Sequence, residues 1–106
     1  MDDEHFHVRF TPLAYEDMDE IDDYISVTLG DPEAAEKLLS KIEQELQHLT
    51  RYPRIGAQPR DTFLASRGYR KLVVENYLVF YILHEAEHEA VVMRVLYGAR
   101  EYRSLL

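Results

Sequence analysis

The chain has 106 residues, 46% of them hydrophobic, which is enough for one packed domain but not for two cores. It contains no cysteine, which excludes disulfides and thiolate metal sites, and no apolar run long enough for a membrane helix. The formal net charge of −8 is uneven, because residues 1–50 hold three Arg/Lys against fourteen Asp/Glu, whereas residues 51–106 hold nine against six. This contrast of −11 with +3 indicates an acidic face and a basic face, although solvating acids on helices would give the same counts.

The N-terminus, Met1-Asp2-Asp3-Glu4-His5, is acidic and lacks the apolar run of a signal peptide. Together with the absence of cysteine, this favours a cytoplasmic protein. We expect a single domain over residues 1–106, with residues 1–5 as a flexible tail.

A short strand is predicted over His5–Thr11, because Phe6, Val8 and Phe10 alternate with polar residues. Thr11-Pro12 predicts the start of a helix. Thr caps free N–H groups, and Pro suits the first helical position because the N–H that it lacks would have no partner within the helix. Apolar residues then recur at spacings of four, three and four: Ala14, Met18, Ile21 and Ile25.

A second helix is predicted from Asp31-Pro32, which repeats the same capping device after a helix stop at Gly30. Its apolar stripe consists of Ala35, Leu38, Ile42, Leu46 and Leu49. The short connection makes the two helices an antiparallel hairpin, ended by Tyr52-Pro53. We expect its outer faces to be solvated acids: Glu16, Asp17, Asp19, Glu20, Asp22, Asp23, Glu33, Glu36, Glu43 and Glu45.

The second half predicts a loop over residues 53–68, followed by three strands. The strands are Tyr69–Val74, Tyr77–His84 and Ala90–Tyr97, joined by short turns and therefore antiparallel. The middle strand is apolar on both faces, which indicates a central strand covered on both sides. Its Tyr77 and Tyr81 are expected to pack in the core. A short helical tail, Ala99–Leu106, follows Gly98.

These elements predict an α+β fold. The antiparallel two-helix hairpin would pack on one face of a small curved, mainly antiparallel four-stranded sheet that includes the N-terminal strand.

Two runs of the second half carry a resemblance to a known family: Tyr69–Tyr81 (YRKLVVENYLVFY) and Val92–Tyr102 (VMRVLYGAREY). They resemble the C-terminal half of the RelE/ParE toxins of addiction modules that stabilise plasmids. The first strand, the two helices and the closing Tyr52-Pro53 resemble the front half of these toxins, so the likeness covers about residues 6–105.

That resemblance implies the toxin of a type II toxin-antitoxin module, inhibiting growth and neutralised by a cognate antitoxin. ParE-like members inhibit DNA gyrase, and RelE-like members promote mRNA cleavage on the ribosome. A degenerate, inactive domain is the third alternative. We expect the antitoxin to cover apolar side chains at element ends: Leu13, Ile25, Leu29, Leu105 and Leu106.

For an mRNA nuclease, the resemblance implies Arg70, Arg100 and Tyr102 as catalytic residues. Such an enzyme must bind phosphates, stabilise developing negative charge and move protons. The chain departs from the nuclease pattern at Leu78, where an Arg usually follows the Tyr that opens the strand. An aliphatic side chain cannot neutralise a phosphorane-like transition state, so gyrase or an unknown target is slightly favoured.

A target would meet the basic half, with Lys71, Arg94 and Arg103 as binding residues. We expect the arginines around Gly98 to be exposed, so that replacing Arg94, Arg100 and Arg103 by Ala leaves the melting temperature nearly unchanged. In the alternative interpretation, these cations decorate sheet edges or pair with acids. No cofactor or metal is expected, since the pairs His5/His7 and His84/His88 lack further ligands at telling spacing.

Overall fold

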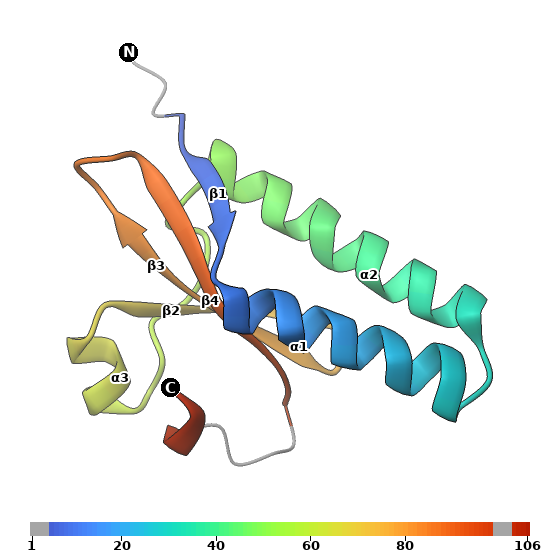
Figure 1. Cartoon of the computed structure of the whole chain (residues 1–106). Helices are drawn as coiled ribbons and strands as arrows, with labels where there is room; N and C mark the ends of the chain where they lie inside the picture. The colour runs from blue at the N-terminus through green and yellow to red at the C-terminus, as the bar shows by residue number, and fades with distance from the viewer. Residues whose placement is uncertain (1–4, 99–102) are drawn as a thin grey trace.

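A four-stranded sheet forms the centre of the protein (Figure 1). The computed structural model describes residues 5–98 and 103–106. The strands are β1 (His7–Phe10), β2 (Tyr69–Val74), β3 (Tyr77–His84) and β4 (Glu89–Tyr97). They lie in the order β1-β4-β3-β2, with β1 parallel to β4 and the other two pairings antiparallel. The predicted α+β class and mainly antiparallel sheet are confirmed, with one parallel pairing at the β1 edge.

Two long helices form the predicted antiparallel hairpin. The helical elements are α1 (Pro12–Asp23), continued by the π-helical turn η1 (Tyr24–Thr28), α2 (Pro32–Gln47), continued by the 3-10 turn η2 (His48–Thr50), the short α3 (Thr62–Ser66), and the 3-10 turn η3 (Arg103–Leu105). Within the described ranges, no helix combines the length and hydrophobicity needed to span a bilayer. Of the predicted terminal segments, residues 1–4 and 99–102 lie outside the described residues.

The hairpin starts and stops where its local signals place it. The Thr11 hydroxyl accepts a hydrogen bond from the Ala14 N–H at 3.1 Å, and the Asp31 carboxylate accepts one from the Ala34 N–H at 3.1 Å. Between the helices, Gly30 has φ +70°, a conformation that costs glycine little because it has no Cβ. These three features confirm both predicted helix starts and the turn between them.

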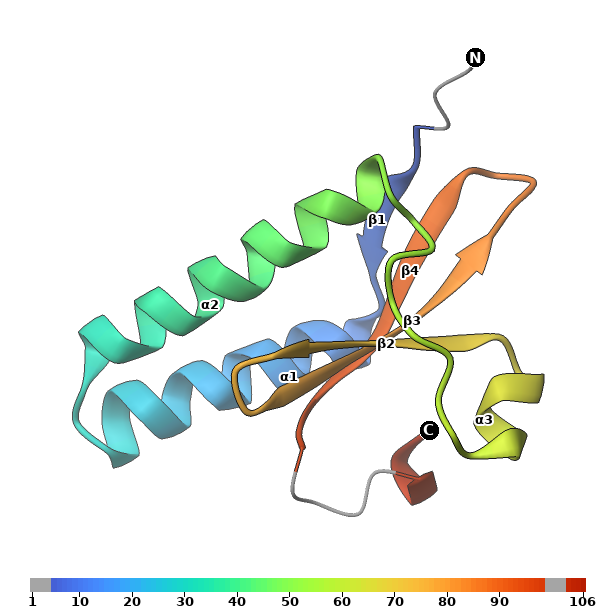
Figure 2. The same cartoon turned by 180° about the vertical axis from the view of Figure 1, so that it is seen from behind.

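The main core lies between the hairpin and one face of the sheet. Ile21 of α1 and Ile42 of α2 belong to the same buried cluster as Val79 and Tyr81 of β3. The turn end of the hairpin projects beyond the sheet (Figures 1 and 2), and Val27 there remains 75% exposed. The sheet therefore covers the hairpin near its base and leaves its tip open.

A second, smaller core lies on the other face of the sheet. Phe80 is fully buried here, whereas its neighbours Val79 and Tyr81 belong to the main core. The three residues divide in this way because successive residues of a strand point to opposite faces. Leu64 and the C-terminal Leu105 pack against it. The prediction that the middle strand is central and covered on both sides is confirmed.

The predicted loop over residues 53–68 is wrong in one part, because Thr62–Ser66 form α3. The Asp61 carboxylate caps this helix by accepting hydrogen bonds from the Phe63 and Leu64 N–H groups. A helix of five residues has little stability of its own. Burial of Leu64 in the second core, where it is 0% exposed, supplies the reason that it forms.

Candidate functional site

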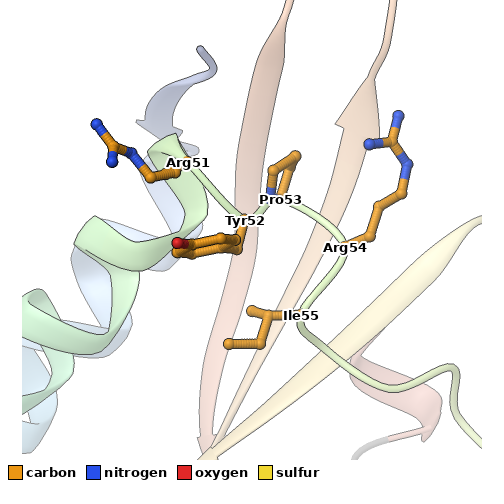
Figure 3. Close-up of a pocket in the computed structure, with 5 residues that line it drawn as sticks. All are labelled: Arg51, Tyr52, Pro53, Arg54 and Ile55. Atoms are coloured by element: carbon orange, nitrogen blue, oxygen red, sulfur yellow. The ribbon is translucent and has the colours of Figure 1, made fainter. Parts of the chain in front are cut away.

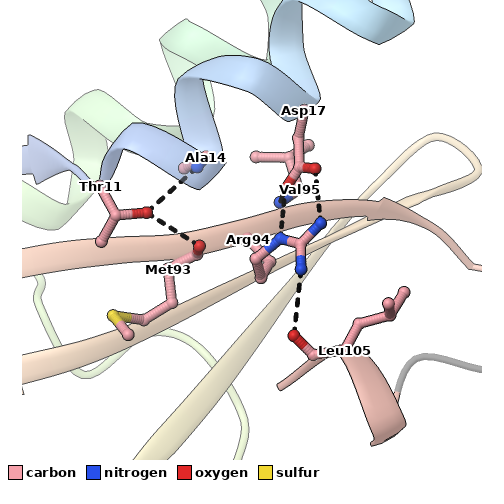
Figure 4. Close-up of polar contacts among 7 residues, drawn as sticks. All are labelled: Thr11, Ala14, Asp17, Met93, Arg94, Val95 and Leu105. Atoms are coloured by element: carbon pink, nitrogen blue, oxygen red, sulfur yellow. Dashed lines mark hydrogen bonds and ion pairs between the residues drawn. The ribbon is translucent and has the colours of Figure 1, made fainter.

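An ion pair between Asp17 and Arg94 joins α1 to β4 (Figure 4). The carboxylate accepts hydrogen bonds from the Arg94 Nε and Nη2 atoms, each at 2.8 Å, and from the Val95 N–H at 2.9 Å. The remaining Nη1 of Arg94 donates to the Leu105 carbonyl at 3.0 Å. One guanidinium thus connects the hairpin, the sheet and the C-terminal turn.

This pair corrects two expectations. Asp17 was predicted on the solvated face of its helix, but it is 6% exposed. Arg94 was expected at the surface, yet its side chain is only 16% exposed and hydrogen bonding to Asp17 raises its pKa. Replacing Arg94, Arg100 and Arg103 by Ala would therefore lower the melting temperature instead of leaving it nearly unchanged. Without Arg94, the buried carboxylate of Asp17 has no cation paired with it.

The spacing of residues along α1 could have predicted that Asp17 is buried. It follows Ala14 by three positions and precedes Ile21 by four, which places it on the buried stripe. On β4, the register shifts at this point: Phe80 pairs with Arg94 and Tyr81 with Val92, so Met93 has no partner on β3. Such bulges commonly redirect a side chain, and this one lies directly beside Arg94.

Arg70 lies on β2 and holds the preceding loop in place. Its Nη1 donates to the Gly56 carbonyl at 2.8 Å and to the Arg54 carbonyl at 3.3 Å. On the next residue, Lys71, the backbone pairs with Ala57 as a short extension of the sheet. The structure thus gives Arg70 a clear structural task, while its predicted catalytic role stays a prediction.

The other predicted site residues lie at or beyond the end of the described segment. Arg100 and Tyr102 fall outside the described residues, and Arg103 opens η3 with a side chain that is not described. Of the three arginines around Gly98, only the side chain of Arg94 is therefore described. It binds Asp17.

The face of the sheet around Leu78 is apolar. Leu78 packs against the second core, where Phe80 and Leu96 are buried and Leu105 and Leu106 cover part of the cluster. A nuclease would need donors aimed at phosphate on this surface. Among the described residues, apolar side chains occupy this surface instead.

A basic segment that was not singled out from the sequence lies along the β2 edge. Residues 51–71 hold six Arg/Lys and one acid, Asp61, which caps α3. Its first part, residues 51–61, crosses the sheet between α2 and α3 (Figure 2), and Arg51 to Ile55 line an open cavity of about 420 Å³ (Figure 3). A count of charged residues in short windows, instead of in the two halves of the chain, would have revealed this basic segment.

Several cations of this basic segment are available to a ligand. Arg51, Arg60 and Arg67 are exposed, and no carboxylate lies within ion-pairing distance of them among residues 5–98 and 103–106. Exposed aromatic rings accompany them, with Tyr52 60% exposed and the Arg67 guanidinium 4.7 Å from the centre of the Phe63 ring. Arginines beside exposed rings suit the binding of phosphate or carboxylate groups.

The apolar residues expected to meet a partner differ in exposure. Leu13 is 52% and Leu29 59% exposed, whereas Ile25 packs against the main core and Leu105 and Leu106 pack against the second. Their contact with a partner stays a prediction. In the described part of the chain, no three His, Cys, Asp or Glu side chains are grouped so that they could hold a metal ion.

The Tyr81 hydroxyl is buried beneath the start of the basic segment. It accepts a hydrogen bond from the Gly56 N–H at 2.9 Å and donates one to the Pro53 carbonyl at 2.8 Å. Burial raises the pKa of Tyr81 above its ordinary 10.0, and the Gly56 hydrogen bond and the charge of Arg70 partly oppose this. The predicted core role of Tyr81 is confirmed, since it is 0% exposed.

This raised pKa predicts a loss of stability in alkali. The folded state holds the Tyr81 proton more tightly than the unfolded state, so the phenol contributes full stability below pH 10 and loses it as the pH rises further. Urea unfolding at about pH 8 and about pH 10.5 measures the loss. In the Tyr81→Phe control, the decrease between the two pH values should be smaller. An equal decrease would show that other groups cause it.

Comparisons with known proteins place the chain beside toxin-antitoxin proteins. The family described as "ParE toxin of type II toxin-antitoxin system, parDE" matches residues 8–102. No curated protein matches the sequence. The fold is similar to that of a chain from the chromosomal ParDE system of P. aeruginosa, with a TM-score of 0.71, 22% identity, and coverage of 89% of this chain and 97% of that one. A chain of the RelBE2 toxin-antitoxin complex of Mycobacterium tuberculosis gives a TM-score of 0.59, 23% identity, and coverage of 88% and 98%.

Proposed function

The chain belongs to the family of ParE toxins of type II toxin-antitoxin systems, toxins that an antitoxin neutralises, and we propose that it arrests growth by binding a large target rather than by cutting RNA. DNA gyrase is the favoured target. The ribosome with its mRNA is the alternative. Both are cytoplasmic, and we place the action of this chain there.

The apolar surface around Leu78 is the observation that carries this proposal. A ribosome-dependent nuclease must place cationic donors against a developing negative charge, and loss of one such donor costs about 10²–10³ in rate. Here Leu78 belongs to a cluster with Phe80 and Leu105. Arg70, the nearest candidate on β2, already donates to two backbone carbonyls. Both features support binding over catalysis.

The basic segment, residues 51–71, is the surface that we assign to the target. The whole acidic excess lies in residues 1–50, whose exposed helix faces would repel DNA or RNA. Arg60 and Arg67 are exposed cations without a carboxylate partner in the described chain, and the guanidinium of Arg67 lies over the exposed ring of Phe63. Guanidinium groups bind phosphates through two parallel hydrogen bonds, which suits an enzyme that holds DNA.

We expect the chain, expressed alone in a bacterial host, to arrest growth, and its antitoxin to restore growth. The purified protein should inhibit gyrase supercoiling and produce no mRNA cuts on translating ribosomes. Replacing Arg60 and Arg67 by Gln should weaken the inhibition at least about tenfold, since hydrogen bonds to charged groups are each worth about 1.5–3 kcal/mol. The matched control is Lys37→Gln, an exposed cation on α2.

Other outcomes separate the alternatives. Mapped mRNA cuts that depend on the ribosome, with supercoiling unaffected, would establish the nuclease instead. Normal growth at confirmed soluble expression would identify a degenerate toxin. Full inhibition by the arginine variant would move the target surface away from the basic segment.

A further inference from the structure

A small cavity lies between α1 and the ends of β3 and β4, on the hairpin side of the sheet. Its volume is about 200 Å³, about the size of one long side chain. Glu20 and Tyr24 line it from the hairpin, and Tyr77 and Tyr97 line it from the two strands. We call it the tyrosine cavity. Nothing in the predicted toxin action uses it.

Three tyrosine side chains surround the cavity. The rings of Tyr77 and Tyr97 meet edge to face, with centroids 5.6 Å apart. Tyr24 is 53% and Tyr97 48% exposed, so the rings can be reached from solvent. The pKa of Tyr77 is raised, first by burial and then by its neighbours Tyr97 and Tyr24, which agrees with three phenol groups gathered in one place. Aromatic ring faces attract cations.

Among the residues that the structure describes, the cavity also carries a negative charge without a cation beside it. Asp17 lies at its wall, but its carboxylate is fully engaged by Arg94 and the Val95 N–H. Glu20 is exposed, and the described chain provides no ion pair for it. Glu16 and Glu20 both act electrostatically on Arg94. Among the described residues that line the cavity, the carboxylate of Glu20 therefore has no cation paired with it.

We propose that the tyrosine cavity receives the guanidinium group of an arginine side chain from the antitoxin. A guanidinium is planar, so it can stack on an aromatic ring while its edge donates to the carboxylate of Glu20. The antitoxin is the chosen source because the surrounding hairpin surface is strongly acidic and residues 1–50 carry a net −11, which attracts a basic protein segment and repels nucleic acid. The inference rests on the pairing with an antitoxin given under Proposed function.

The chemistry of the cavity can be tested with a small probe. We expect N-acetyl-arginine amide, titrated into the purified protein, to shift the NMR signals of the Tyr24, Tyr77 and Tyr97 rings in a saturable way. N-acetyl-citrulline amide has nearly the same shape without the charge and should shift them little. The Glu20→Gln variant should weaken arginine binding about two- to fivefold, as expected for a partly exposed ion pair. Glu36→Gln, an exposed acid on α2, is the matched control.

Equal shifts with arginine and citrulline, or none with either, would overturn the assignment. So would an effect of Glu36→Gln as large as that of Glu20→Gln. These titrations contain no gyrase and no ribosome, so their outcome is independent of the target.

Growth rescue tests the source of the arginine. Toxin variants Glu20→Arg and Glu36→Arg are each expressed with and without the antitoxin encoded beside this chain, and the rescue ratio is compared. The rescue ratio is the growth with antitoxin divided by the growth without it. We expect this ratio to be the same for Glu36→Arg as for the unchanged toxin. For Glu20→Arg we expect it to be at least about fivefold lower. Equal rescue of both toxic strains would remove the antitoxin as the occupant. Absence of toxicity in every strain would instead contradict the proposed function.

Discussion

Replacing Asp17 by alanine is expected to lower the free energy of unfolding by about 3–5 kcal/mol, the range for breaking a buried ion pair from one side. The variant would leave the Arg94 guanidinium largely buried without its carboxylate, and it would leave the Val95 N–H without an acceptor. For a domain of this size, the loss corresponds to a fall in melting temperature of more than about 10 °C. Chemical unfolding followed by circular dichroism measures it.

The matched control is Asp19→Ala, which removes an exposed acid from the same helix and should change stability by less than about 0.5 kcal/mol. A second variant, Asp17→Leu with Arg94→Met, should recover part of the loss, because no charge then remains unpaired. If Asp17→Ala proves as stable as Asp19→Ala, the pair does not hold α1 to the sheet in solution.

Replacing Gly56 by alanine should destabilise the protein by about 2–3 kcal/mol, toward the upper end of the range for overpacking a core. A Cβ at this position would lie 2.6 Å from the Tyr81 Oη atom and 2.7 Å from its Cε1 atom. The ring cannot move aside easily, because it is fully buried and its hydroxyl is hydrogen-bonded to Gly56 and Pro53. Urea unfolding of the purified variant gives the value.

Gly98→Ala is the comparison, since its Cβ would meet no atom closer than the Asn76 carbonyl oxygen at 3.2 Å. We expect a clearly smaller loss there. Gly56→Ala also displaces the start of the basic segment. We therefore expect the folded fraction of this variant to inhibit the target more weakly than the unchanged protein does. Wild-type stability of Gly56→Ala would show that the loop stands farther from Tyr81 than described.

The hairpin and the strand limits could be predicted from the sequence because their signals are local. Thr11-Pro12 and Asp31-Pro32 cap helices within three residues of themselves, and Gly30 supplies a turn conformation that depends on one residue. The alternating and continuous apolar runs of residues 69–97 likewise determine strands with little reference to the rest of the chain.

The site depended on contacts between residues far apart in the chain, and only the tertiary structure decided them. Asp17 stands among acidic neighbours and resembles a solvated residue until Arg94, 77 positions later, is placed against it. Arg70 has the charge of a catalytic residue, yet its guanidinium is directed at loop carbonyls. The tyrosine cavity joins Glu20 and Tyr24 to Tyr77 and Tyr97 across more than half of the chain. Capping and periodicity act over a few residues, whereas burial and ion pairing are set by whichever distant groups the fold brings together.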